Sequence, residues 1–293
     1  MSFKAEVDSR AACAYDLFKC LCYLSSRSKR AVTRVRGFAM AIEVETLDPP
    51  TKVDKSDQRV RAMFGSIARR YDFLNHLLSL NIDRSWRRFT TKMVPPEPGV
   101  AVLDCCTGTA DLALEYHKVG KGLSPVIGTD FCHEMLILGN VKVRKAQASE
   151  NVVLVEGDTQ RLPLPTNTFG VVTVAFGLRN VRDTVRGIDE MIRVAKPGGK
   201  VAILEFSRPR GAVLGRAYLA FFRQVLPRVG QAIAPNSQGA YHYLPASVLQ
   251  FPDGQEMVDL LTSRGLTKTR AYPLTFGVAT LYVGVKPRGE SGG

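Results

Sequence analysis

One stretch constrains the fold of this 293-residue chain more than any other. A short apolar run from Val100 to Leu103 ends in an acid, Asp104, and leads through small residues around Gly108 into a helical pattern that starts at Asp111. This order predicts a strand, a tight turn and a helix N-terminus, which is where α/β sheets bind nucleotide-like ligands. Small residues in the turn let the backbone approach such a ligand closely.

Two further apolar runs also end in acids. Val126 to Asp130 reads as a second strand with a carboxylate at its tip, and Val152 to Asp158 reads as a third. A carboxylate at the tip of the second strand can accept hydrogen bonds from both hydroxyls of a ribose. The three strand-end acids therefore indicate an α/β domain that binds a ligand containing a ribose.

The turn favours S-adenosylmethionine over a dinucleotide. NAD normally requires G-x-G-x-x-G, so that its pyrophosphate can rest on the helix N-terminus. Only Gly108 is present here, and Asp111 places a negative charge where the pyrophosphate would lie. A sulfonium ligand that carries an amino acid tolerates this acid better.

Composition limits the classes of partner. A formal net charge of +13 favours an anionic partner such as nucleic acid, anionic lipid or an acidic substrate, and no run is apolar enough to span a bilayer. The six cysteines form no C-x-x-C pair, which indicates reduced thiols in a cytoplasmic protein. The four histidines lack metal-ligand spacing, so we expect no metal.

The ends of the chain differ from its middle. Residues 1–50 are rich in Lys and Arg and end in Asp48-Pro-Pro50, so we expect a basic N-terminal extension that is disordered or precedes the true start at Met40. We expect one folded domain over 51–288 and a flexible tail over 289–293. A basic membrane-surface or organelle-targeting role for the extension stays open.

The elements of the middle follow from periodicity. Apolar residues recur at helical spacing over 54–92. These helices either cover one edge of the sheet or form a lid over the ligand, and in the second case Tyr71 and Asn75 face the ligand. Strands are expected at 169–175, 200–206, 266–272 and 277–285, with a helix over 183–195 that a Lys196 to Gly199 turn stops. Residues 212–234 are apolar and dotted with arginines, as in a buried helix or a helix on anionic lipid.

Several blocks resemble one family, the ubiquinone/menaquinone biosynthesis C-methyltransferases, and most closely the demethylmenaquinone methyltransferases. The blocks lie at Met63 to Asn75 with Trp86 to Arg88, Leu103 to Asp111, Phe176 to Val181, Glu190 to Gly199, Leu204 to Ser207 and Tyr241 to Pro252. The resemblance implies a Rossmann-like α/β fold, a seven-stranded mostly parallel sheet with helices on both faces, and N-terminal lid helices. It covers 56–287 and leaves the extension without a counterpart.

The resemblance also implies the cofactor site, with Asp130 on the ribose and Asp158 near the adenine amine of S-adenosylmethionine. Ala175 stands where relatives often have serine, and Asp83 where they often have histidine. The predicted cofactor-binding residues are Asp104, Gly108, Thr109, Asp111, Asp130, Asp158, Thr159 and Ala175.

The catalytic candidates are Arg179, Asn180 and Tyr71, which by resemblance form a deprotonation site with Asp158. A ring carbon becomes a good nucleophile when the neighbouring hydroxyl ionises, and a guanidinium nearby lowers the pKa of that hydroxyl. The alternative for Arg179 is a salt bridge to Asp183 at the start of the next helix.

The expected reaction is C-methylation of a polyprenyl quinol, demethylmenaquinol to menaquinol, by an enzyme in peripheral contact with an anionic membrane surface. The alternatives are the benzoquinol intermediate of ubiquinone biosynthesis, another phenolic acceptor, or a non-catalytic partner in a quinone-synthesis assembly. Nucleic acid is not expected as a partner, because the loop after the fourth strand lacks the Asn/Asp-Pro-Pro-aromatic motif of base methylation. The oligomeric state, a homodimer included, stays open.

Overall fold

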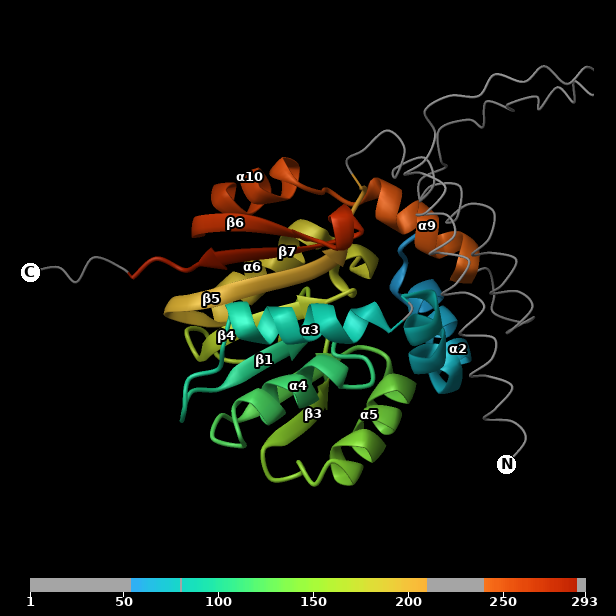
Figure 1. The fold of residues 1–293 in the computed structure, drawn as a ribbon, viewed down its shortest axis with the longest axis horizontal. Helices are drawn as coiled ribbons and strands as arrows, with labels where there is room; N and C mark the ends of the chain where they lie inside the picture. Colours follow the sequence, from blue (N-terminus) through green and yellow to red (C-terminus); the bar gives the residue numbers. More distant parts are fainter. Residues whose placement is uncertain (1–53, 80, 210–239, 289–293) are drawn as a thin grey trace, which may run out of the picture. The chain divides into compact units, whose positions relative to one another are not determined.

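The structure is a computed structural model that describes residues 54–79, 81–209 and 240–288. These residues form a seven-stranded sheet of order β3-β2-β1-β4-β5-β7-β6 (Figure 1). The run from β3 to β5 is parallel, and β7 is antiparallel to both β5 and β6. The expected mostly parallel α/β sheet is confirmed. Its strands are β1 (Val102–Cys105), β2 (Val126–Asp130), β3 (Val152–Glu156), β4 (Phe169–Ala175), β5 (Ala195–Phe206), β6 (Thr267–Leu274) and β7 (Ala279–Val285).

Helices cover both faces of this sheet, as Figure 1 shows for α3 and α4 on one face and α6 on the other. Ala202 and Leu204 of β5 pack into the apolar cluster beneath α3 and α4, and Val201 and Ile203 pack into the cluster beneath α6 and α10. A strand buried on both faces is apolar at every position rather than at every second one. The helices are α2 (Asp57–Leu78), α3 (Ile82–Met93), α4 (Asp111–Val119), α5 (His133–Lys145), α6 (Thr184–Val194), α9 (Ala240–Gln250) and α10 (Gln255–Ser263).

The helical region expected over 54–92 forms two helices, α2 and α3. Between them Asn81 adopts a φ of 61°, a left-handed conformation that a right-handed helix cannot continue. In α3, Trp86 is buried, and its indole N–H donates to the Thr275 hydroxyl at 2.8 Å. This contact ties α3 to the hairpin between β6 and β7.

The turn expected at Lys196 to Gly199 lies inside the range of β5. Helix α6 ends at Val194 as expected, but the chain pairs with β4 from the next residue, with a register shift between Phe169 and Val171. A Cβ on Gly199 would lie 2.8 Å from the carbonyl oxygen of Lys196 and 2.9 Å from that of Phe169. Gly199 therefore allows the backbone of β5 to approach that of β4 closely, whereas we had expected this glycine to mark a turn.

Among the described residues, no helix combines the length and apolar character of a membrane span. The basic extension over residues 1–50, the arginine-dotted stretch over 212–234 and the tail over 289–293 lie outside the described residues. Our expectations for these segments stay predictions, as do the domain boundaries.

Candidate active site

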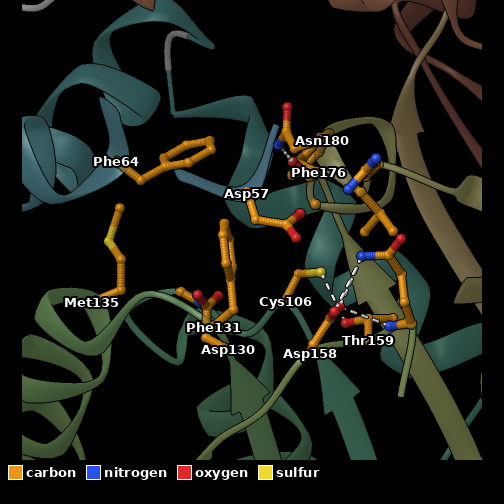
Figure 2. A pocket seen from close by; sticks show the side chains of 15 residues that line it. Asp57, Phe64, Cys106, Asp130, Phe131, Met135, Asp158, Thr159, Phe176 and Asn180 are labelled. Carbon is orange, nitrogen blue, oxygen red and sulfur yellow. Dashed lines mark hydrogen bonds between the residues drawn. The ribbon is translucent and has the colours of Figure 1, made fainter. Parts of the chain in front are cut away.

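A cleft of about 580 Å³, counting its open mouth, lies where the parallel strands end (Figure 2). Its walls come from the segments that follow β1, β2, β3 and β4 and from helices α2 and α5. The lining residues are Asp57, Phe64, Cys106, Gly108, Asp130, Phe131, Met135, Asp158, Thr159, Gln160, Phe176, Gly177, Asn180, Val181 and Arg182.

The turn after β1 is built from left-handed residues. Cys106, Gly108 and Ala110 have φ values of 49°, 55° and 69°, so the backbone coils tightly before α4 begins. Beneath it the Thr107 hydroxyl donates to Asp104 at 2.7 Å, and burial raises the pKa of Asp104 to about 7. Asp104 thus supports the turn from below and is not among the residues that line the cleft.

Asp130, at the tip of β2, lines the cleft and is buried. Its two carboxylate oxygens accept hydrogen bonds from the backbone N–H groups of Gly108 at 2.9 Å and Cys132 at 2.8 Å. Burial raises its pKa to about 6, although these N–H groups act in the opposite direction. A carboxylate offers about four lone-pair sites, so Asp130 retains capacity to accept from hydroxyl donors.

Thr109 and Asp111 are bound by a lysine that sequence reasoning missed. Lys142 of α5 pairs with the Asp111 carboxylate and donates to the Thr109 hydroxyl at 3.1 Å. Neither residue is among those that line the cleft, and the same holds for Ala175 at the end of β4. The negative charge that we counted against a pyrophosphate is therefore balanced by Lys142.

Asp158 and Thr159 line the opposite wall, in the segment after β3. Asp158 accepts from the backbone N–H of Gln160 at 2.8 Å and also from its side-chain amide. The Thr159 hydroxyl lies 3.3 Å from Sγ of Cys106, so the segments after β1 and β3 touch (Figure 2).

The segment after β4 carries two of the three catalytic candidates, Arg179 and Asn180, and includes a 3-10 turn, η1 (Leu178–Asn180). Asn180 lines the cleft, whereas Arg179 is buried outside the lining. Arg179 Nη1 donates to Glu205 at 2.9 Å and to the carbonyl of Phe176. The expected alternative partner, Asp183, instead caps α6 by accepting the N–H of Arg186 at 3.0 Å. Tyr71 lies on α2, and its side chain is outside the described part.

Sequence reasoning missed an apolar wall that α2 and α5 contribute. Phe64 of α2 and Phe131, which directly follows Asp130, pack with Met135 of α5 in one cluster (Figure 2). An aromatic next to a strand-end acid was the available signal for Phe131. Phe64 and Met135 had no local signal, because their place depends on how the two helices pack. Together with Asp130, this wall suits a ligand that has both hydroxyls and an aromatic ring.

Solved structures share this architecture at low sequence identity. A SAM-dependent methyltransferase from Thermotoga maritima superposes with a TM-score of 0.53 at 16% identity, covering 78% of this chain and 99% of that one. The [4+2]-cyclase SpnF gives a TM-score of 0.56 at 16% identity, covering 79% and 96%. These likenesses show the fold alone, since a cyclase and a methyltransferase share it.

Curated relatives are far more similar. The chain is 44% identical to a ubiquinone/menaquinone biosynthesis C-methyltransferase UbiE from Geobacter sp. strain M21, over 80% of this chain and 99% of that protein. It is 42% identical to a demethylmenaquinone methyltransferase from Deinococcus radiodurans, over 81% and 97%. A family model described as the ubiE/COQ5 methyltransferase family matches residues 52–286. The chain therefore belongs to the ubiE/COQ5 methyltransferase family.

Proposed function

We propose that this chain transfers the methyl group of S-adenosylmethionine to a ring carbon of a polyprenylated quinol, converting demethylmenaquinol to menaquinol. The observation that carries the proposal is the family match over residues 52–286, together with a demethylmenaquinone methyltransferase that is 42% identical over 97% of its own length. The benzoquinol intermediate of ubiquinone biosynthesis is the second candidate acceptor, because the Geobacter relative is named for both quinones.

The cleft supplies side chains that fit each part of the cofactor. When bound, S-adenosylmethionine supplies an electrophilic methyl group on a sulfonium sulfur. The Asp130 carboxylate would accept the ribose hydroxyls, and the turn at Gly108 would hold the amino-acid end. Phe131 would offer an apolar face to the adenine, and Asp158 would accept its amine. The backbone bonds to Asp130 keep the carboxylate in place, so it needs little reorientation on binding.

The segment after β4 acts on the acceptor. A quinol carbon becomes nucleophilic when the adjacent hydroxyl ionises, and a nearby guanidinium favours the ionised form. Arg179 is our candidate for this electrostatic role rather than for the base, because a guanidinium stays protonated in proteins. Asn180 and Tyr71 complete the proposed hydrogen bonds to the acceptor. Alignment of carbon, methyl and sulfur contributes up to roughly 7–11 kcal/mol to the rate in well-oriented systems.

The enzyme meets its acceptor at an anionic membrane surface. The chain carries a net charge of +13, and each basic residue near such a surface contributes on the order of 1 kcal/mol. Phe276, at the tip of the hairpin between β6 and β7, is 81% exposed. Ala279 pairs with Phe206 at the end of β5, so this tip lies at the same edge of the sheet as the cleft.

The quinone profile of cells that lack this gene tests the proposal. We expect demethylmenaquinone to accumulate and menaquinone to return when the gene is restored. Accumulation of a demethylated ubiquinone precursor would assign the benzoquinol instead. An unchanged profile of both quinones would contradict the proposal.

A further inference from the structure

Glu205 is a fully buried carboxylate that the proposed mechanism has not used. It stands near the end of β5, and its Oε1 accepts the backbone N–H of Arg179 at 3.2 Å. Its Oε2 accepts Nη1 of Arg179 at 2.9 Å and the backbone N–H of Phe206 at 3.1 Å. One side chain thus binds Arg179 at both its backbone and its guanidinium.

The guanidinium keeps unused donor capacity. Its hydrogen bonds run through Nη1, and its buried Nε has no hydrogen-bond partner within the described ranges. The Phe206 ring lies 5.3 Å from its Cζ. In the next residue, Asn180, the buried Oδ1 likewise has no partner there, and that side chain lines the cleft. Buried polar atoms of native proteins are nearly always paired, and Asn180 is the one of these two residues whose side chain a ligand in the cleft can reach.

Four titratable groups from other segments interact electrostatically with this ion pair. They are Lys55 before α2, Cys106 after β1, Tyr243 on α9 and Tyr282 on β7. Burial raises the pKa of the thiol and of both phenols, so these three groups stay neutral near pH 7. Burial lowers the pKa of Lys55. The charges that act on one another here are then those of the ion pair and of Lys55, while Asp57, Asp158 and Arg182 are further charged side chains that line the cleft.

We propose that Glu205 is a positioning residue for methyl transfer: it fixes Arg179, which directly precedes Asn180 of the cleft wall, and through its charge it sets the pH at which the acceptor hydroxyl ionises. This inference rests on the proposed function. A carboxylate near a developing phenolate disfavours ionisation, whereas the guanidinium favours it. Glu205 therefore holds the Arg179 side chain in position and at the same time offsets part of its positive charge.

Two substitutions separate these effects. Glu205→Gln removes the charge, so the acidic limb of the kcat/KM profile for the quinol should move to lower pH by about one unit or more. Glu205→Asp keeps the charge but shortens the reach, so kcat should fall by about tenfold or more while the limb stays in place. The KM for S-adenosylmethionine should change little in both, because Asp130 and Gly108 lie in other segments.

Glu190→Gln is the matched control. Glu190 pairs with Arg193 at 2.7 Å on α6 and is not among the residues that line the cleft. In this variant the acidic limb of the kcat/KM profile and the value of kcat should match those of the parent protein, although it too loses a glutamate from an Arg–Glu pair. The inference would be overturned if the acidic limb of the kcat/KM profile stayed at the same pH in Glu205→Gln, or if it moved equally in Glu190→Gln. If Glu205→Gln fails to fold, Glu205→Asp decides, and an unchanged kcat there overturns it.

A measurement without turnover separates this inference from the proposed function. The ionisation of 4-nitro-1-naphthol is followed by absorbance in the presence of protein and S-adenosylhomocysteine. The bound naphthol should ionise at lower pH in Glu205→Gln than in the parent. Equal ionisation in both proteins, or no binding to the parent, overturns the inference. Failure of the parent to methylate any quinol, with the naphthol shift present, would contradict the proposed function alone.

Discussion

Asp130 is the residue on which we expect cofactor binding to depend most. Its carboxylate is buried, accepts two backbone N–H groups, and still faces the cleft. Because burial raises its pKa to about 6, it is ionised at neutral pH and takes up a proton as the pH falls through that value. A ribose bound there donates to the ionised form, so binding and ionisation are linked.

We expect the affinity for S-adenosylmethionine to weaken as the pH falls below about 6, by up to about tenfold per pH unit. The sign follows because the protonated carboxyl must lose its proton before it can accept both hydroxyls. Titration calorimetry from neutral pH to about two units lower checks this. The Asp130→Asn variant should bind more weakly at every pH and show no such slope. The same slope in both proteins would exclude Asp130 as its source.

Gly177 tests how closely the segments after β1 and β4 must approach. A Cβ on Gly177 would lie 2.3 Å from Cβ of Cys106, so Gly177→Ala must push the two cleft walls apart. We expect a loss of about 1–3 kcal/mol in the free energy of unfolding, together with reduced turnover. In Gly187→Ala, on α6, the nearest atoms lie at 3.4 Å, and stability should stay equal or rise. Denaturant unfolding of both variants checks this, and equal losses would contradict it.

Sequence reasoning identified residues whose position follows from a strand end. Gly108, Asp130, Asp158, Thr159 and Asn180 were all named in advance and line the cleft. Glu205, the partner of Arg179, was not identified. It lies on β5, and no local sequence pattern shows that the two residues pair. Likewise, Lys142 approaches Asp111 only after α4 and α5 have packed.

At the scale of elements, α3 packs against the segment that follows β4 and against the end of β5. The ring centroids of Trp86 lie 5.8 Å from Phe176 and 6.1 Å from Phe206, and Cζ of Arg87 lies 5.7 Å from the Phe176 ring. Asp83 of this helix is buried and paired with Arg87. Helix α3 thus acts as a support, while the lid role expected for the N-terminal helices stays a prediction.

A substitution at the start of α6 tests whether Arg179 acts as the proposed electrostatic group or forms a salt bridge to Asp183. Asp183 caps this helix, so Asp183→Ala should lower the free energy of unfolding by about 1 kcal/mol. Because Arg179 pairs with Glu205 instead, kcat/KM should stay within about twofold of the parent. Thermal unfolding and steady-state kinetics measure both quantities. A large loss of turnover in Asp183→Ala would favour an Arg179–Asp183 salt bridge during the reaction.

The elements themselves were largely predictable, because strands buried on both faces are apolar runs and Pro-Gly-Gly often follows a helix. Helix α6 ends near the expected residue, and the two closing strands lie within a few residues of their expected ranges. The break at Asn81 was not predictable, since a left-handed asparagine leaves no periodic signal. The early start of β5 depends on pairing between Ala195 and Phe169, which is a long-range contact.

At the scale of the whole molecule, the edge that holds the cleft is the one we expect to meet lipid. The side chain of Phe276 is 81% exposed, and that of Leu123, which precedes β2 at the opposite edge of the sheet, is 60% exposed. Phe276→Ser should weaken sedimentation with phosphatidylglycerol vesicles by about tenfold, since burial of a Phe side chain contributes about 1.5–3 kcal/mol. Leu123→Ser should leave it unchanged. Equal effects of both substitutions, or no binding to these vesicles, would contradict this orientation.

Methyl transfer by the purified chain tests the central claim most directly. The protein is incubated with methyl-labelled S-adenosylmethionine and either reduced demethylmenaquinone or the demethylated benzoquinol, and the labelled quinones are identified by mass spectrometry. We predict label on the ring carbon of menaquinone and much less on the benzoquinone. Label on neither quinol, with the protein folded and S-adenosylmethionine bound, would contradict the assignment.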